Sequence, residues 1–375
     1  MAHFLKSITG FFGGGTKSVI GIDIGYSSIK IVQLRKRKGR ALLETYGELS
    51  LGPYAGVDVG RAASLPVEKL SEAVVDLMRE ANVTARDCGV AIPTASSLVS
   101  LIELPAIGEK ELAEMIPMEA RKYIPVPVSE VALDWWVIPQ GDNMSPIPEE
   151  DGQQNKVQKG RMVDVLLVAI LNETLTKYHD LVRLAGLRCS FFEVEIFSSI
   201  RASLEHNDIA PVMILDIGAA VTKLSIVERG LVRSSHTINR GAQDITIAVS
   251  KAMGVSGIEA EKRKRAYGIV KDAASPEIVE VGTTVLNYIF AEARKIIINF
   301  EKRYAKNVGR VVMTGGGATL KGILESAREN FQTEAVLADP FSKIEAPAFL
   351  QDVLADAGPE FSVALGVALR KITEE

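Results

Sequence analysis

Two kinds of hydrophobic pattern alternate along the chain. Short apolar runs, typical of buried strands, are followed by longer stretches whose apolar residues recur every three or four positions, as on one helix face. This alternation predicts an α/β fold. β-Hairpins are expected at residues 19–34 and 212–227, the first continuing into 41–50, with further strands at 89–93, 97–104, 131–138, 162–170 and 310–314. Helices are expected at 68–82, 109–123, 173–185, 195–204, 241–253, 258–268, 279–304 and 319–329.

One polar motif interrupts this pattern twice. In each copy an apolar strand runs into Asp-x-Gly, a tight turn of small or hydroxyl residues follows, and a second apolar strand returns. The copies are Val19-Ile-Gly-Ile-Asp-Ile-Gly-Tyr-Ser-Ser-Ile-Lys-Ile-Val-Gln-Leu34 and Val212-Met-Ile-Leu-Asp-Ile-Gly-Ala-Ala-Val-Thr-Lys-Leu-Ser-Ile-Val227. Because one copy opens each half of the chain, we predict two related lobes that present their turns to one shared ligand.

The chemistry of the turns indicates a phosphate ligand. Gly25 and Gly218 let backbone amides approach an anion closely. Asp23 and Asp216 would repel that anion unless a divalent cation lay between them, and hard cations take oxygen ligands and waters. A nucleotide with Mg²⁺, held by both aspartates through water, fits best; the alternative is two structural hairpins whose aspartates cap turns. The hydroxyl residues of the turns are Ser27, Ser28 and Thr222.

A glycine cluster offers a place for the rest of a nucleotide. Gly315, Gly316 and Gly317 follow a predicted strand and precede a predicted helix. Their backbone can approach a ligand, and the helix N-terminus adds positive potential. Many strand–helix turns carry such a cluster, so its weight comes from its position after both Asp-x-Gly hairpins.

Charged residues on two predicted helices complete the candidates. Glu261, Lys264 and Arg265 share one helix face and would clamp a base and ribose, with a solvated charged face as the alternative. Glu195 opens another helix. A carboxylate there either orients a hydrolytic water toward a γ-phosphate or is a first-turn acid favoured by the helix dipole.

Composition narrows the class of protein. Hydrophobic residues make up 47% of the 375 residues, which supports a sizeable core, and the net charge of −4 gives no field that would attract nucleic acid. Two cysteines are too few for a disulfide framework, and the four histidines are scattered, which does not indicate a zinc site. No apolar run reaches the roughly 20 residues of a transmembrane helix. Residues 1–12 lack the long apolar core of a signal peptide, so we expect a cytoplasmic protein.

Two segments stand apart from the alternating pattern. Residues 1–16 form a predicted tail, in which residues 1–15 are a possible amphipathic helix that ends in the three glycines at 13–15. Together with the basic cluster at 35–40, the tail predicts peripheral membrane contact through residues 1–12; a frayed tail or a helix docked on another protein are the alternatives. Residues 141–160 lack apolar periodicity and are predicted to be a mobile loop. The apolar residues of the tail are Phe4, Leu5, Ile8, Phe11 and Phe12.

In chain order these segments resemble the five-part signature of the actin-like ATPase superfamily: first phosphate loop, connecting helix, second phosphate loop, adenosine loop and closing helix. Within it, three stretches resemble the PilM family of type IV pilus assembly proteins, which is similar to the division protein FtsA. They are Ile22-Asp-Ile-Gly-Tyr-Ser-Ser-Ile-Lys-Ile-Val-Gln-Leu34, Met118-Glu-Ala-Arg-Lys-Tyr-Ile-Pro-Val-Pro-Val-Ser-Glu-Val131 and Asp164-Val-Leu-Leu-Val-Ala-Ile170. The resemblance covers nearly the whole chain from about residue 17.

The resemblance implies roles for the candidate residues. Lys30 joins Asp23 and its neighbours in the first phosphate loop, and Glu195 becomes the carboxylate of the connecting helix. The glycines at 315–317 become the adenosine loop, and the face at 261–265 becomes the nucleoside clamp. The implied ligands are ATP and Mg²⁺, with at most slow hydrolysis.

The resemblance also implies an actin-like fold: two lobes, each with a mixed β-sheet flanked by helices, and a small α+β subdomain in the first lobe. We expect the first lobe at 17–85 and 166–205, the partner-binding subdomain at 86–165, the second lobe at 206–345, and a C-terminal segment at 346–375 that returns to the first lobe. The implied function is an ATP-binding scaffold at the inner face of the inner membrane. It would hold the N-terminal cytoplasmic tail of a PilN-like membrane protein near residues 89–138, and contact pilus motor ATPases and other platform proteins.

The sequence departs from the family pattern at three places, and two alternative functions remain open. Tyr26 stands where a small residue is common, Ala219 and Ala220 leave the second loop with fewer hydroxyls, and Pro117 interrupts a helix of the partner groove. The first alternative is an FtsA-like division or cytoskeletal ATPase. The second is a sugar or metabolic kinase of the same superfamily, which needs a catalytic base beside a substrate pocket.

Overall fold

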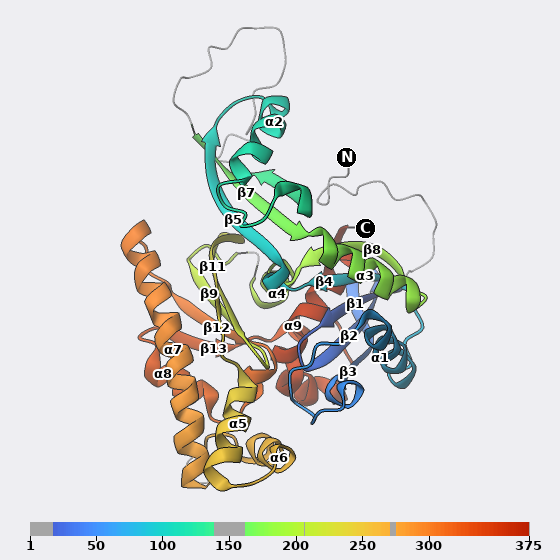
Figure 1. Cartoon of the computed structure of the whole chain (residues 1–375), viewed down its shortest axis with the longest axis vertical. Coiled ribbons are helices and arrows are strands. Elements are labelled where there is room, and N and C mark those ends of the chain that lie inside the picture. Colours follow the sequence, from blue (N-terminus) through green and yellow to red (C-terminus); the bar gives the residue numbers. More distant parts are fainter. Residues whose placement is uncertain (1–17, 139–161, 206, 271–274, 375) are drawn as a thin grey trace.

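The computed structural model describes residues 18–138, 162–205, 207–270 and 275–374. The amphipathic tail predicted at 1–16 and the loop predicted at 141–160 lie outside these residues. Figure 1 shows two lobes side by side, with a smaller subdomain projecting above them. Of the helices in the described ranges, none combines the length and the apolar character needed to cross a bilayer.

The first lobe is built on a five-stranded sheet. Its strands are β1 (Ser18–Ile24), β2 (Ser28–Arg37), β3 (Arg40–Ser50), β4 (Asp87–Ile92) and β8 (Arg188–Val194), in the order β3-β2-β1-β4-β8. Helices α1 (Val67–Glu80) and α3 (Asn172–Leu184) pack on the face that carries Ile20, Ile22 and Ile29. Helices α4 (Glu195–Ser203) and α9 (Gln351–Glu374) lie on the opposite face, against Val19, Val32 and Leu34.

The second lobe repeats this plan. Its strands are β9 (Val212–Ile217), β10 (Thr222–Glu228), β11 (Leu231–Ile238), β12 (Arg310–Thr314) and β13 (Glu334–Leu337), in the order β11-β10-β9-β12-β13. The outer face, with Met213 and Leu215, shares a core with four helices. The inner face, with Val212 and Ile214, packs toward Ile200 of α4. The four helices are α5 (Ala242–Met253), α6 (Gly257–Tyr267), α7 (Pro276–Tyr304) and α8 (Ile323–Asn330).

The two sheets have the same topology, and this places both copies of the sequence motif. In each sheet the central strand pairs antiparallel with the strand that follows it and parallel with a later one. Because strand side chains alternate between faces, Asp23 shares the inner face with Val19, and Asp216 shares it with Ile214. The two aspartates therefore project toward the space between the lobes.

The small subdomain is a separate antiparallel sheet. Its strands β5 (Ser97–Pro105), β6 (Val131–Val137) and β7 (Met162–Leu171) are ordered β5-β7-β6. Helix α2 (Glu109–Ala120) shares its core and continues through Pro117. The segment expected at 86–165 also takes in β4, which belongs to the first-lobe sheet, and leaves out the end of β7.

Two tight turns that the apolar pattern did not predict separate additional strands from the two hairpins. The prediction that the first hairpin continues into 41–50 is wrong, because Lys38 (φ 50°) and Gly39 (φ 79°) turn the chain back and β3 pairs antiparallel with β2. Arg229 (φ 51°) and Gly230 (φ 74°) likewise connect β10 to the unpredicted strand β11. Two successive residues with positive φ suit the short turns of β-hairpins, and only the glycine in each pair signals such a turn.

Helix α9 was also missed by the sequence pattern, since it contains residues typical of turns. Gly366 allows close packing on α4, because a Cβ there would lie 2.0 Å from the carbonyl oxygen of Ser198. Gly21 does the same on β1, where a Cβ would lie 1.9 Å from the carbonyl oxygen of Ala364. These close approaches fix α9 against the first-lobe sheet, directly beside the strand that carries Asp23.

We therefore predict that Gly21→Ala is strongly destabilising. The added methyl group would overlap the backbone of α9, and the displacement is expected to cost about 3 kcal/mol of folding free energy. Gly108→Ala is the matched control, because a Cβ at Gly108 meets nothing within 4 Å; the control should cost less than about 1 kcal/mol. Unfolding midpoints in urea compare the two variants, and equal midpoints would contradict the packing described for α9.

Candidate functional site

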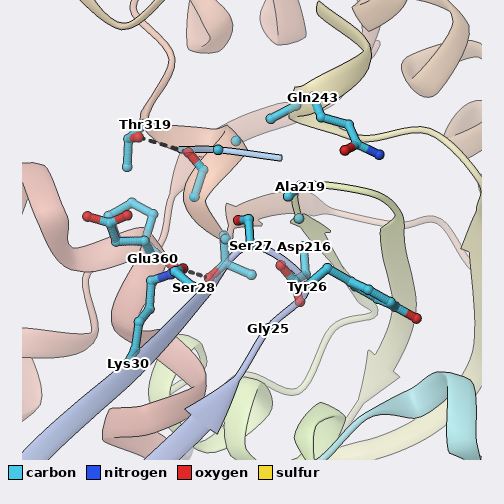
Figure 2. Close-up of a pocket in the computed structure, with 18 of the residues that line it drawn as sticks. Gly25, Tyr26, Ser27, Ser28, Lys30, Asp216, Ala219, Gln243, Thr319 and Glu360 are labelled. Carbon is cyan, nitrogen blue, oxygen red and sulfur yellow. Dashed lines mark hydrogen bonds between the residues drawn. The ribbon is translucent and has the colours of Figure 1, made fainter. Parts of the chain in front are cut away.

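One cavity of about 290 Å³ lies between the lobes, where the hairpin turns meet α5, α6 and α9. Figure 2 shows the turn with Gly25 and Ser27 beside Asp216 and Ala219 of the other turn, with Glu360 at the edge of the same space. Every candidate residue from the sequence except Thr222 lines this cavity: Asp23, Gly25, Ser27, Ser28, Lys30, Glu195, Asp216, Gly218, Glu261, Lys264, Arg265, Gly315, Gly316 and Gly317.

Thr222 is brought close to the cavity but does not line it. Its side chain is fully buried at the start of β10, and its hydroxyl donates a hydrogen bond to the carbonyl oxygen of Arg240 at 2.9 Å. The hydroxyl therefore holds β10 to the segment after β11. It is not presented to a ligand.

The two turns have matching backbone geometry. The amide of Gly25 donates to the carbonyl oxygen of Ser28 at 2.9 Å, and the amide of Gly218 donates to that of Val221 at 3.0 Å. A Cβ on Gly218 would lie 2.9 Å from the carbonyl oxygen of Val221, so the second turn can close only around glycine. Both turns thus bring a short stretch of backbone to the same cavity from opposite lobes.

Each hairpin also places a lysine opposite its aspartate. Lys30 is the cross-strand partner of Asp23, and Lys223 is the partner of Asp216. The Lys30 ammonium donates to Ser28 Oγ at 2.8 Å and pairs with Glu48 at 2.9 Å. Lys223 was not a candidate from the sequence, although it follows Asp216 at the same spacing as Lys30 follows Asp23; the duplicated motif itself carries the signal that would have found it.

Glu195 lies deep between the lobes with both carboxylate oxygens engaged. Oε1 accepts a hydrogen bond from the backbone amide of Thr94 at 2.6 Å. Oε2 accepts one from the Lys223 ammonium at 2.7 Å, and the same ammonium lies 2.9 Å from Asp216 Oδ2. Lys223 therefore joins a carboxylate of the first lobe to a carboxylate of the second.

The glycine cluster packs directly on the second turn. Gly315 has φ 84°, and a Cβ there would lie 2.3 Å from Asp216 Oδ1. Its amide donates to the carbonyl oxygen of Pro359 at 2.8 Å, which ties the cluster to α9. By contrast, a Cβ on Gly316 would meet nothing closer than Glu360 Oε2 at 3.7 Å, so its backbone faces open space in the cavity.

The charged face of α6 closes another wall. Glu261 pairs with Lys264 and with Arg265, each at 2.7 Å, and accepts a hydrogen bond from Thr246 at 2.6 Å. Burial lowers the pKa of Lys264 despite its pairing with Glu261. The face is therefore an internally paired network in which Glu261 and Lys264 are buried and Arg265 is exposed to solvent.

Several lining residues were not candidates from the sequence. Glu48 comes from β3 and Glu360 from α9; burial and the nearby charge of Glu48 raise the pKa of Glu360. Gln243 accepts a hydrogen bond from the amide of Ala62 at 3.1 Å and so links the lobes. Thr319 completes this group. None of the four belongs to a recognisable motif, and each reaches the cavity only through tertiary packing.

Buried negative charge dominates the electrostatics of the cavity. Burial, followed by the charge of Glu195, raises the pKa of Asp23 from 3.8 to about 6, although Lys30 and Lys223 act to lower it. A nearby cation stabilises the ionised form of a carboxyl group whose pKa is raised in this way. Among the described residues, no three Asp, Glu, His or Cys side chains are arranged so that they could hold a metal ion.

The fold with paired turns at homologous places in two sheets is that of the actin-like ATPases. MreB5 of Spiroplasma citri bound to ADP is a structural neighbour, with a TM-score of 0.53, 12% identity, and coverage of 96% of this chain and 98% of that one. At this identity the likeness supports the fold alone. It confirms the predicted two-lobed architecture of mixed sheets flanked by helices.

The family described as type IV pilus assembly protein PilM matches residues 21–372, and the chain belongs to this family. The solved PilM–PilN type IV pilus biogenesis complex contains a chain that resembles it with a TM-score of 0.77 and 24% identity, over 94% of this chain and 98% of that one. Cell division protein FtsA of Bacillus subtilis (strain 168) is 25% identical over 263 residues, 63% of this chain. That alignment spans only 58% of the FtsA length.

The raised pKa of Asp23 predicts a pH-dependent effect of Asp23→Asn. An acid that binds its proton more tightly when folded loses stability as pH rises from its unfolded pKa of 3.8 to its folded pKa of about 6. In metal-free buffer the asparagine variant should therefore be more stable than the parent above pH 6, by up to about 3 kcal/mol, and similar near pH 4. Chemical unfolding across this range measures the difference, and parallel profiles would contradict a strained Asp23.

Proposed function

We propose that this chain is an ATP-binding scaffold of the type IV pilus assembly platform, on the cytoplasmic side of the inner membrane. The observation that carries the proposal is the convergence of both phosphate turns, the glycine cluster and the α6 face on one cavity. Family membership supports the pilus role. The ADP bound to the MreB5 neighbour supports a nucleotide as the ligand.

In this proposal each wall of the cavity recognises a different part of ATP. The turns at Gly25 and Gly218 and the Lys30 ammonium would contact the phosphates. Asp23 and Asp216 would hold Mg²⁺ through water, and the ion would supply charge neutralisation between phosphates and carboxylates. Gly316 and the α6 face would contact the nucleoside. Because these groups belong to both lobes, bound nucleotide would favour one angle between the lobes over others.

Removing either aspartate should test the nucleotide site. Asp23→Ala and Asp216→Ala are each expected to abolish magnesium-dependent ATP binding while leaving the fold intact, because the metal loses one of its two proposed supports. Isothermal titration calorimetry with Mg·ATP measures the affinity, and circular dichroism checks the fold. Asp180→Ala, on the exposed surface of α3, is the control that should bind like the parent; unchanged affinity in both cavity variants would reject the site.

For the partner, we propose that the small subdomain binds the short cytoplasmic tail of a PilN-like membrane protein. The neighbour solved as a PilM–PilN complex supports this choice. β6 is an edge strand, and no described strand pairs with its outer side. An extended peptide can add to such an edge through backbone hydrogen bonds. Trp136 of β6 is 44% exposed and offers an apolar contact beside that edge.

Trp136→Ala should weaken this interaction. Large aromatic side chains dominate peptide interfaces, so a loss of about tenfold or more in affinity is expected. Fluorescence anisotropy with a labelled peptide of the partner's tail measures the change. Ile298→Ala, at a similarly exposed apolar position on α7, is the control that should bind normally. Equal binding by both variants would exclude this face of the subdomain. Deleting 86–165 is a less clean test, because it would also remove β4 from the first-lobe sheet.

A further inference from the structure

Lys223 lies at the centre of the interface between the lobes. Its ammonium is 2.7 Å from Glu195 Oε2, at the start of α4, and 2.9 Å from Asp216 Oδ2, at the end of β9. The side chains of Glu195 and Asp216 are only 9% and 13% exposed, and that of Lys223 is 22% exposed. A single largely buried positive charge is therefore shared by two largely buried negative charges, and the three groups together keep one net negative charge.

The equivalent lysine of the first hairpin is used differently. Lys30 and Lys223 occupy the same place in the two copies of the motif, each opposite an aspartate. On its other side Lys30 faces Glu48 of β3, and its ammonium pairs with that residue. On its other side Lys223 faces Thr237 of β11, which carries no charge. Lys223 therefore turns back to Asp216 and across the interface to Glu195.

This contact reduces the capacity of Glu195 to bind and orient a water. A carboxylate that orients an attacking water needs an oxygen lone pair directed at that water. The backbone amide of Thr94 bonds to one oxygen of Glu195 and Lys223 bonds to the other, so each oxygen keeps only one lone pair for a further donor.

We propose that Lys223 is an internal cation of the cavity: its ammonium takes the place that a divalent ion would otherwise occupy between Asp216 and Glu195, and it keeps Glu195 from orienting a water. Lys223 thus acts as a positioning residue. The inference rests on the proposed nucleotide site and deepens it, since the cavity would hold ATP without cleaving it readily. Because Lys223 pairs with Oδ2 of Asp216, Asp23 and Oδ1 of Asp216 are then left to hold a hydrated Mg²⁺ through water.

Divalent-ion binding without nucleotide tests the first half of this proposal. In Lys223→Met, two facing carboxylate oxygens lose their cation, and Asp23 adds a third negative charge nearby. The variant should bind Mn²⁺ with a dissociation constant on the order of 0.1 mM, measured by electron paramagnetic resonance, whereas the parent should bind none in that range. Lys223→Gln, which keeps a hydrogen-bond donor but no charge, repeats the test if the methionine variant does not fold.

The controls separate this effect from a general loss of positive charge. Lys177→Met removes a lysine from the neighbouring cavity, where its ammonium donates to the carbonyl oxygen of Leu65 and pairs with neither carboxylate; this variant should bind no Mn²⁺. The double variant Lys223→Met, Glu195→Gln should lose the Mn²⁺ site. A folded Lys223 variant that binds no Mn²⁺ would overturn the proposal.

Phosphate release from Mg·ATP tests the second half. Hydrolysis adds water to the γ-phosphorus, breaks its bond to the ADP oxygen and passes the water proton to a base. With Glu195 freed, Lys223→Met should release phosphate at least about tenfold faster than the parent, and the gain should vanish in the double variant with Glu195→Gln. A variant that binds Mn²⁺ without this gain would overturn the suppression of hydrolysis. Failure of the parent to bind ATP would contradict the proposed function and leave the Mn²⁺ result standing.

Discussion

Negative charge buried between the lobes is the constraint on which the rest of the cleft depends. Asp23 and Asp216 project from facing sheets, and Glu195 enters between them at the start of α4. Carboxylates this close are tolerated only with cations beside them, and the chain supplies Lys30 and Lys223 from the same two hairpins. The raised pKa of Asp23 indicates that the compensation is incomplete. A site with residual negative charge and two sets of closely packed backbone turns is suited to a polyphosphate that arrives with its own cation.

The internal symmetry of the fold explains why both Asp-x-Gly turns lie at one cavity. A difference between the two halves explains why their lysines have different partners. Both sheets share one topology, so both Asp-x-Gly turns reach the same interface. The residue on the third strand of each sheet then determines the partner of the lysine. Glu48 on β3 lies opposite Lys30 and pairs with it. Thr237 on β11 lies opposite Lys223 and carries no charge, so Lys223 pairs with Glu195 of the other lobe. In the proposed nucleotide site, this difference would leave the binding groups in place while restraining Glu195.

A scaffold role accords with this arrangement. The small subdomain lies on the first lobe, and β5 contacts β11 of the second lobe, so the angle between the lobes bears directly on the placement of the sheet that we propose binds the partner. At the cavity, Lys223 and Gln243 of the second lobe bond to Glu195 and Ala62 of the first lobe. Bound nucleotide can therefore influence the subdomain through packed elements alone, and slow turnover would be compatible with such a switch.

The sequence alone determined the α/β class, both hairpins and fourteen of the residues that line the cavity, because period-two burial and the duplicated Asp-x-Gly motif are local properties of the chain. It did not reveal β3 as a separate strand or α9 as a helix, since the signals at Lys38–Gly39 and at Gly358, Pro359 and Gly366 resemble those of other turns. Glu48, Gln243 and Glu360 were likewise beyond reach, because only tertiary packing brings them to the cavity. The tertiary structure also decided that Thr222 is buried and that Lys223 pairs across the lobes, since the partner of a side chain depends on which strand lies beside it.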